Sequence, residues 1–363
     1  MYKISLKALK KAQRFRSRKI DNPNLIDFAS NDYLGLANKT KLLDKAIKLV
    51  KRYDNHSPRS SMLVNGYHPI HKLFEERLLE YQEFENATVV GSGFLANISL
   101  IEALTRRGDI LFIDEEYHAS GVLATKLIED RVVYFAHNDP QDLENKLKRY
   151  RYNRSLIAVE GVYSMSGNIC NREIIDIANS YNSILIMDEA HSSGVIGKNL
   201  LGIFDYYNLP IKENYIKMGT LGKAYGSYGA YILASNEIIS FLENRAKPII
   251  YSTAPSIIDI ALALINLEYI HKNRKKLLKK IEVRYKIIKE ILNIEKESLI
   301  LAISQKSNQD ALYIQKLLID NGYMIGAIRP PTVKSPILRV IPRLGSSKKD
   351  LINILKIIKY NRV

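Results

Sequence analysis

The chain has 363 residues, of which 46% are hydrophobic and 25% are charged, and it contains one cysteine and no tryptophan. This length and balance are typical of an ordinary globular protein of one or two domains, and they exclude a fibrous or largely disordered chain. With Cys170 as the only cysteine, the sequence excludes an intramolecular disulfide framework and a multi-cysteine metal site, and we expect no metal.

The N-terminus and the apolar runs bear on location. Residues 1–19 mix lysine and arginine with isolated apolar residues and have no continuous apolar segment, so they do not form a secretory signal. The most apolar stretch, 257–270, is interrupted by Asp259, Asn266 and Glu268, whereas a membrane span needs about 18 apolar residues in a row. We therefore expect a cytoplasmic protein that makes no membrane contact.

The formal net charge is +16, from 54 Lys and Arg against 38 Asp and Glu. Such an excess could serve a nucleic-acid surface or an acidic protein partner, or it could lie on solvated helix faces. In the run 271–280, apolar residues recur at helical spacing and place the lysines on the opposite face. This pattern favours solvated helix faces, and we expect no nucleic-acid partner.

From about residue 85 to 235, short apolar runs alternate with amphipathic stretches of helical length. Strands that are buried on both faces appear as continuous apolar runs, and intervening helices connect parallel strands, so the pattern predicts an α/β domain with a mostly parallel sheet flanked by helices. The predicted strands are 88–90, 110–113, 131–135, 156–160, 184–188, 215–218 and 230–233.

After residue 233 the pattern changes to long helical stretches and few strands. The predicted helices are 257–270, 276–292, 308–321 and one that begins at Lys348, and the predicted strands are 324–328 and 337–341. We expect an N-terminal arm at 1–39, a large domain at 40–236, and a smaller α+β domain at 237–363 that packs with the arm. The sequence has no Gly/Ser-rich linker, which indicates close packing of these parts.

The run 184–188 ends in Asp188, with His191 in the loop that follows. Ligands of parallel sheets bind beyond the carboxyl ends of the strands, so Asp188 lies where a ligand is expected. A carboxylate there can keep a heterocyclic nitrogen protonated, which lets pyridoxal phosphate act as an electron sink.

Asp188-Glu-Ala-His191 is also the letter pattern of a helicase box. A helicase needs a phosphate loop of the form GxxxxGK[ST]. Gly197-Lys198 has Ser192 where the first glycine belongs, and Gly222-Lys223 lacks both that glycine and the final Ser or Thr. The helicase interpretation is therefore disfavoured.

Lys223 follows a predicted strand and lies between Gly222 and Ala224. Lysine forms a Schiff base with an aldehyde, and small neighbours let a planar cofactor approach the backbone. A lysine in a glycine-rich loop is most often a surface residue, but its position one strand after Asp188 favours a role in the site.

Two other loops are weaker signals. Gly91, Ser92 and Gly93 lie between a predicted strand and a helix, where helix N-terminal amides could bind phosphate, although such turns are common. His118 follows another strand and could stack on an aromatic cofactor, although loop histidines are more often only hydrogen-bonded.

Together these segments resemble the α-oxoamine synthases, a family of fold-type-I pyridoxal-phosphate enzymes, and the resemblance extends almost end to end. The motifs that carry it occur in the family's order at 28–36, 66–71, 92–97, 118–120, 160–165, 188–191, 220–223 and 251–253.

Residues 135–139, Phe-Ala-His-Asn-Asp, and 327–333, Ala-Ile-Arg-Pro-Pro-Thr-Val, resemble the branch that condenses L-alanine with a pimeloyl thioester in biotin synthesis. Other branches, which use another amino acid or acyl donor, stay open as the alternative. The thioester carrier, coenzyme A or an acyl-carrier protein, also stays open, and the basic surface could receive an acidic carrier protein.

The resemblance implies a role for each residue that matches a family motif. Lys223 would bond the cofactor aldehyde and then act as the base, Asp188 would pair with the ring nitrogen, His191 and Ser164 would lie near the ring hydroxyl, and His118 would stack on the ring. The cofactor phosphate would be held by the following residues: Ser92, Gly93, Phe94 and Thr220, with Ser252 and Thr253 of a second subunit in a homodimer that shares its active sites.

For the substrates, the resemblance implies that Arg329 binds the alanine carboxylate, with Asn31 nearby from the partner chain. Arg14 and Thr332 would contact the acyl substrate, and Arg16 and Arg18 offer alternative registers for Arg14.

The sequence departs from the family at residues 55–66. The family pattern there is rich in glycine, whereas this chain has His56, Pro58 and Ser60, which restrict the backbone. We expect the conformation of this loop to differ and the cofactor residues to be unaffected.

Overall fold

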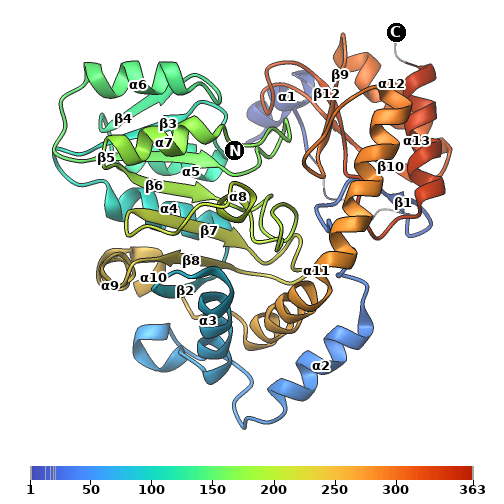
Figure 1. Ribbon diagram of the computed structural model, residues 1–363. Helices are drawn as coiled ribbons and strands as arrows, with labels where there is room; N and C mark the ends of the chain where they lie inside the picture. The colour runs from blue at the N-terminus through green and yellow to red at the C-terminus, as the bar shows by residue number, and fades with distance from the viewer. Residues whose placement is uncertain (1, 13, 17, 19, 21, 362–363) are drawn as a thin grey trace.

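In the computed structural model, which describes residues 2–12, 14–16, 18, 20 and 22–361, one seven-stranded sheet forms the centre of the larger lobe (Figure 1). The strands occur in the order β2-β8-β7-β6-β5-β3-β4, and every neighbouring pair is parallel except the two pairs that include β8. Their bounds are β2 Asn86–Val90, β3 Ile110–Asp114, β4 Val132–Phe135, β5 Ser155–Glu160, β6 Ile184–Asp188, β7 Tyr215–Thr220 and β8 Ala230–Ala234. All seven predicted strands and the mostly parallel sheet are confirmed.

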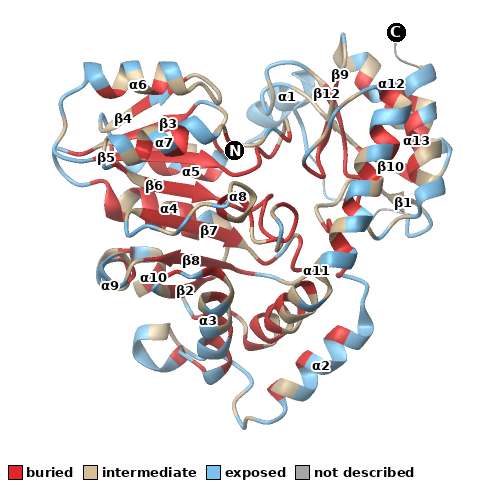
Figure 2. Ribbon diagram, viewed as in Figure 1, coloured by how far each residue is buried: buried red, intermediate tan, exposed pale blue. Residues whose placement is uncertain are grey.

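Each face of this sheet is covered by helices, because successive side chains of a strand point to opposite faces. In β6, Leu185 and Met187 belong to one apolar core and Ile186 to the other. The first core contains α2 Thr40–Val50, α3 Pro69–Gln82, α6 Pro140–Arg149, α7 Arg172–Ser180 and α8 Ile203–Tyr206. The second contains α4 Gly93–Leu104, α5 Ala119–Ala124, α9 Asn236–Arg245 and α10 Lys247–Ile250. The strands are therefore buried on both sides (Figure 2), except β4 at the edge of the sheet, where Tyr134 is exposed.

The smaller lobe contains a three-stranded antiparallel sheet in the order β11-β12-β9. Its strands are β9 Leu301–Ser304, β11 Gly326–Ile328 and β12 Ile337–Val340, and its helices are α12 Asn308–Asp320 and α13 Lys348–Tyr360. A third apolar core lies between them. Two short segments, β1 Ile26–Asp27 and β10 Tyr323–Met324, pair in parallel and join the N-terminal arm to this lobe.

The secondary structure of the C-terminal region differs from the prediction in three places. One continuous helix, α11 Ile257–Leu292, replaces the two predicted at 257–270 and 276–292, because residues 271–275 contain no glycine or proline to break it. The strand predicted at 324–328 is divided into β10 and β11, which join different sheets, and β9 was not predicted.

The helix α11 also shows where the lobes meet. Ile257 to Ile281 contribute to the large-lobe core, whereas Ile287, Ile288 and Leu292 belong to the third core. Since α9 and α10 pack on the large sheet as well, the structure places residues beyond the expected boundary at 236 in the larger lobe. Nowhere in the described ranges is a helix both long enough and apolar enough to span a membrane.

The remaining elements lie near the N-terminus and in loops. They are α1 Lys3–Lys11, whose residues are all exposed, a π-helical turn η1 Met62–Gly66, and a 3-10 turn η2 Thr125–Leu127. In the loop that departs from the family, Arg59 adopts a left-handed conformation with φ of 61°. Gly66 is required there, because a Cβ atom on it would lie 2.0 Å from the carbonyl oxygen of Ser60.

Candidate active site

Lys223, His191 and Tyr33 form a connected group beyond the carboxyl ends of β6 and β7. The amine Nζ of Lys223 lies 3.0 Å from His191 Nε2, and the hydroxyl of Tyr33 lies 2.5 Å from His191 Nδ1. Burial, and then the positive charges of Lys223 and Arg339, hold the pKa of His191 well below its usual range. His191 is therefore a neutral imidazole, which donates at one nitrogen and accepts at the other and so links the phenol to the amine.

The environment of the Lys223 amine lowers its pKa. Burial lowers its pKa to about 8, although the negative charge of Asp188 acts in the opposite direction. An amine with this pKa is partly unprotonated near neutral pH, which a nucleophile or a general base requires.

Asp188 ends β6 and is almost fully buried. Its Oδ1 accepts a hydrogen bond from the backbone N–H of Ala190 at 2.9 Å, and its Oδ2 accepts one from Nδ2 of Asn97, on α4, at 3.0 Å. Tyr117 in turn donates to Asn97 Oδ1 at 2.7 Å. The carboxylate is thus held in one orientation at the edge of the sheet, as pairing with a protonated ring nitrogen requires.

The turn between β2 and α4 has the shape of a phosphate cradle. Ser92 is the N-cap of α4 and accepts a hydrogen bond from Leu95 N–H, which leaves other amides of the first turn to bind an anion. A Cβ atom on Gly93 would lie 2.5 Å from Thr220 Cγ2, so only glycine lets the two segments approach this closely. Within the described residues, the buried hydroxyl of Thr220 has no hydrogen-bond partner, as expected of a group that binds a ligand.

His118 and Ser164 lie around the same group. His118 is the N-cap of α5, and its Nδ1 lies 2.7 Å from Ser120 Oγ. Burial lowers the pKa of His118, Asp188 raises it and Lys223 lowers it, which places the ring near both charges. Ser164 is almost fully buried, and its carbonyl oxygen accepts a hydrogen bond from the arginine described next.

Arg339 is a site residue that the sequence interpretation missed. It extends from β12 of the smaller lobe, donates from Nε to Ser164 O at 2.9 Å and from Nη1 to Asn31 Oδ1 at 3.0 Å, and is almost fully buried. Its Nη2 is buried and has no partner in the part of the chain that the structure describes. The available signal was an arginine in the middle of an apolar strand, where a buried charge needs a partner.

Asn31 accepts a hydrogen bond from Arg339 of its own chain, and its expected place near a partner's substrate stays a prediction. Arg329, Arg14 and Thr332 are not part of the Lys223 group. They line a separate pocket of about 640 Å³ between α1 and the loop after β11. Thr253 is exposed and Ser252 half-buried, on the segment that precedes α11.

The geometry fits pyridoxal phosphate on three counts: a buried amine for the aldehyde, a carboxylate for the ring nitrogen, and a phosphate cradle with an unpartnered hydroxyl. The residues that could hold the cofactor are Ser92, Gly93, Phe94, His118, Ser164, Asp188, His191, Thr220 and Lys223.

Comparison with known proteins gives the same picture. The chain matches the family of class I and II aminotransferases over residues 23–358. A protein named 8-amino-7-oxononanoate synthase from Helicobacter pylori (strain J99) is 45% identical over 352 residues, which cover 96% of this chain and 94% of the relative. A protein named putative 8-amino-7-oxononanoate synthase from Aquifex aeolicus is 37% identical over 362 residues, which cover 95% of this chain and 94% of the relative.

Solved structures confirm the fold-type-I prediction. A serine palmitoyltransferase from S. paucimobilis, solved with bound pyridoxal phosphate, has a TM-score of 0.87 at 20% identity, over 99% of this chain and 96% of that one. An 8-amino-7-oxononanoate synthase from Francisella tularensis has a TM-score of 0.79 at 26% identity, over 93% of this chain and 98% of that one. Given these matches along nearly the whole sequence, the protein belongs to the class I and II aminotransferase family of pyridoxal-phosphate enzymes.

Proposed function

We propose that the protein catalyses the decarboxylative condensation of L-alanine with a pimeloyl thioester, the reaction of 8-amino-7-oxononanoate synthases in biotin biosynthesis. The relatives that bear this name support the choice of reaction. The structural observation that carries the proposal is one buried group in which an amine, a carboxylate and an arginine with a free N–H meet.

When bound, pyridoxal phosphate supplies an electron sink for negative charge at the substrate Cα. Asp188 keeps the ring nitrogen protonated, and Thr220 with the first turn of α4 holds the phosphate. Lys223 would hold the cofactor through its amine and, once that amine is released, would accept the proton from the Cα of alanine, for which its pKa of about 8 is suitable. His191, neutral and fixed by Tyr33, orients the amine.

For the alanine carboxylate, the geometry supports Arg339 in place of Arg329. Two of the three guanidinium nitrogens of Arg339 are already fixed by Ser164 and Asn31, and the third, Nη2, is buried and has no partner among the residues that the structure describes. A carboxylate is the ligand that best matches such a guanidinium. The positive charge of Arg339 also lowers the pKa values of Lys223 and His191, which supports a position near the reacting amine.

The pocket that contains Arg14, Arg329 and Thr332 suits the acyl donor. Apolar side chains of Leu6 and Leu9 line it together with three arginines, Arg14, Arg16 and Arg329. Leu6 and Leu9 can cover the methylene chain of a pimeloyl group, and an arginine can bind its terminal carboxylate. The adjoining helix α1 is exposed and carries four lysines, which supports an acidic acyl-carrier protein as the donor.

A homodimer is supported by large apolar side chains left exposed near the phosphate cradle. These are Leu63, Val64, Tyr67, Phe94, Tyr228 and Tyr251, of which Val64 is 75% and Tyr251 80% exposed. A patch of this kind on a folded protein marks an interaction surface, and a second copy would bring Ser252 and Thr253 to its partner's phosphate. Cytoplasmic location stays a prediction.

The central test is an assay of the purified protein, loaded with pyridoxal phosphate, with pimeloyl-coenzyme A and alanine, glycine or serine. We expect carbon dioxide and 8-amino-7-oxononanoate from alanine, and no turnover with Lys223→Ala. Faster reaction with glycine or serine would assign the protein to another branch of the family. Thioesters of acyl-carrier protein and coenzyme A, compared at low and high salt, test the carrier.

A pair of matched variants tests the two arginines. Arg339→Lys should raise the KM for alanine by about tenfold or more, since a lysine cannot keep the hydrogen bonds to Ser164 and Asn31 and also offer the donor that Nη2 provides. Arg329→Lys should instead raise the KM for the thioester. If Arg329→Lys raised the KM for alanine and Arg339→Lys raised the KM for the thioester, Arg329 would be the residue that binds the alanine carboxylate.

A further inference from the structure

Glu160 and Asp188 are two acids that end neighbouring parallel strands of the large sheet. Glu160 is the last residue of β5, Asp188 is the last of β6, and the two are paired in register. Side chains at paired positions of neighbouring strands point to the same face of the sheet, so the carboxyl groups lie side by side. They are only 1% and 3% exposed. Two buried carboxyl groups in this arrangement cannot both ionise without strong repulsion.

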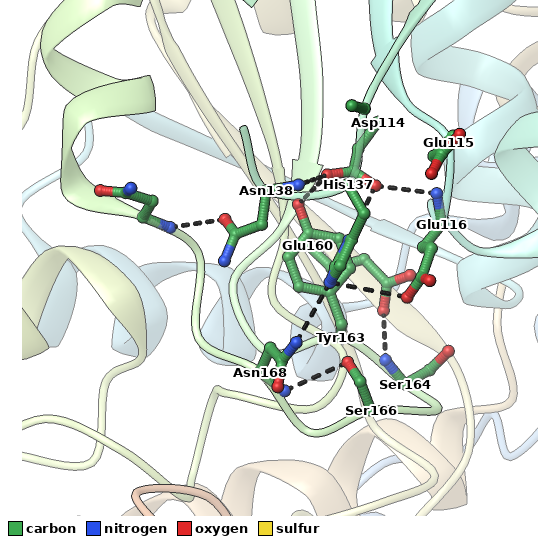
Figure 3. A network of polar contacts seen from close by, with 12 residues as sticks. Asp114, Glu115, Glu116, His137, Asn138, Glu160, Tyr163, Ser164, Ser166 and Asn168 are labelled. Carbon is green, nitrogen blue, oxygen red and sulfur yellow. Dashed lines mark hydrogen bonds and ion pairs between the residues drawn. The ribbon is translucent and has the colours of Figure 1, made fainter. Parts of the chain in front are cut away.

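Hydrogen bonds decide which of the two carries the charge. Each oxygen of Asp188 accepts a hydrogen bond, from Ala190 N–H and from Asn97 Nδ2. Glu160 accepts only one, from the backbone N–H of Ser164 to Oε2 at 2.9 Å, as Figure 3 shows. Its Oε1 is buried and, within the described residues, has no partner. Because donated hydrogen bonds stabilise a carboxylate, the negative charge belongs on Asp188 and a proton on Glu160.

On balance, the charged and titratable groups around Glu160 also favour its protonated form. Burial raises the pKa of Glu160, the charges of Asp188 and Asp114 raise it further, and only Lys223 and the hydrogen bond from Ser164 lower it. The phenols within reach of Glu160 are uncharged at neutral pH, since burial raises their pKa values: Tyr33, Tyr117 and Tyr163.

The contact to Ser164 gives Glu160 a role beyond its charge. Its Oε2 fixes the N–H of Ser164, and the carbonyl oxygen of the same residue accepts the hydrogen bond from Arg339 Nε at 2.9 Å. One side chain at the end of β5 therefore holds the residue that orients the arginine of the smaller lobe.

We propose that Glu160 is an uncharged positioning residue, which carries its proton on Oε1, orients Arg339 through Ser164, and leaves Asp188 as the single negative charge of this strand pair. The role of Arg339 in this statement rests on the proposed function, whereas the protonation of Glu160 does not.

Infrared difference spectroscopy of the cofactor-free protein at neutral pH tests the protonation directly. A protonated carboxylic acid has a carbonyl stretch that a carboxylate and a glutamine lack. We expect Glu160→Gln to remove one such band from the spectrum. Glu75→Gln is the matched control, because Glu75 is also buried and burial raises its pKa to about 7. The band of Glu75 should be lost in Glu75→Gln and should persist in Glu160→Gln. A spectrum unchanged by Glu160→Gln would overturn the proposal.

Steady-state kinetics test the positioning. Glutamine keeps the acceptor for Ser164 N–H and adds no charge, so Glu160→Gln should keep the KM for alanine within about twofold of wild type, the change expected where no hydrogen bond is lost. Glu160→Asp is one methylene shorter and should raise that KM about tenfold, the effect of one lost contact, while the KM for the thioester stays unchanged. Equal loss in both variants would refute the positioning role. If the protein turned over neither substrate, the proposed function would fail while the infrared result still stood.

Discussion

Replacing Lys223 with methionine should stabilise the cofactor-free protein, because the amine that the proposed reaction needs is costly to bury. Burial lowers its pKa from 10.5 to about 8, and one pKa unit corresponds to about 1.4 kcal/mol, so the protonated amine costs at most about 3 kcal/mol at neutral pH. Methionine avoids this cost but loses the 3.0 Å contact to His191, which is worth about 1 kcal/mol. We expect a net gain of about 2 kcal/mol in the free energy of unfolding.

The gain should depend on pH in a defined direction. The pKa of Lys223 is lower in the folded than in the unfolded chain, so between about pH 8 and 10.5 the unfolded chain binds more protons and wild-type stability rises with pH. The methionine variant lacks this rise. Its advantage should therefore shrink across the window and become a deficit of about 1 kcal/mol above it, where only the lost contact counts.

Urea denaturation of both cofactor-free proteins across this pH range measures the difference. Lys279→Met, on an exposed position of α11, is the control and should show no such trend. A Lys223→Met variant that is less stable than wild type at neutral pH, or whose advantage does not change with pH, would refute the reasoning.

Three further predictions concern the cradle, the core and a loop histidine. Gly93→Ala should raise the dissociation constant of pyridoxal phosphate about tenfold or more in an absorbance titration, because its Cβ would lie 2.5 Å from Thr220 Cγ2. Leu100→Ala, in the core between α4 and the sheet, should cost about 2–5 kcal/mol in urea denaturation, against little change for exposed Leu43→Ala. Burial lowers the pKa of His137, but the hydrogen bond and charge of Asp114 and the charge of Glu116 outweigh burial, so the pKa is raised overall. The stability that His137 adds over His137→Gln should therefore be complete below about pH 6.5 and decline as pH rises through the higher folded-state pKa.

Much of the larger lobe could be predicted from the sequence, because its signals are local. Apart from β4, whose Tyr134 is exposed, the strands are apolar runs buried on both faces, and such runs can be recognised without knowledge of their neighbours. Asp188 and Lys223 each follow a strand, and parallel strands bring such residues to one edge of a sheet. The group around Lys223 could be predicted from the sequence for the same reason.

The role of Arg339 could not be predicted in this way, because its place in the site depends on how the two lobes pack. The motif that contains Arg329 indicated an arginine near this part of the chain, but its sequence does not say which arginine crosses to the larger lobe. The contact between Asn31 and Arg339 was not predicted for a related reason, since a contact across 308 residues of sequence has no local signal. The continuity of α11 was not predicted, although residues 271–280 already show apolar residues at helical spacing.

Helix α11 determines how the enzyme can move. Its 36 residues span roughly 54 Å at 1.5 Å per residue, and no glycine or proline interrupts them. A rod of this length that is embedded in the cores of both lobes leaves no flexible joint along its axis. The two cores are thus joined by one continuous helix, and its length sets the spacing between them along this axis.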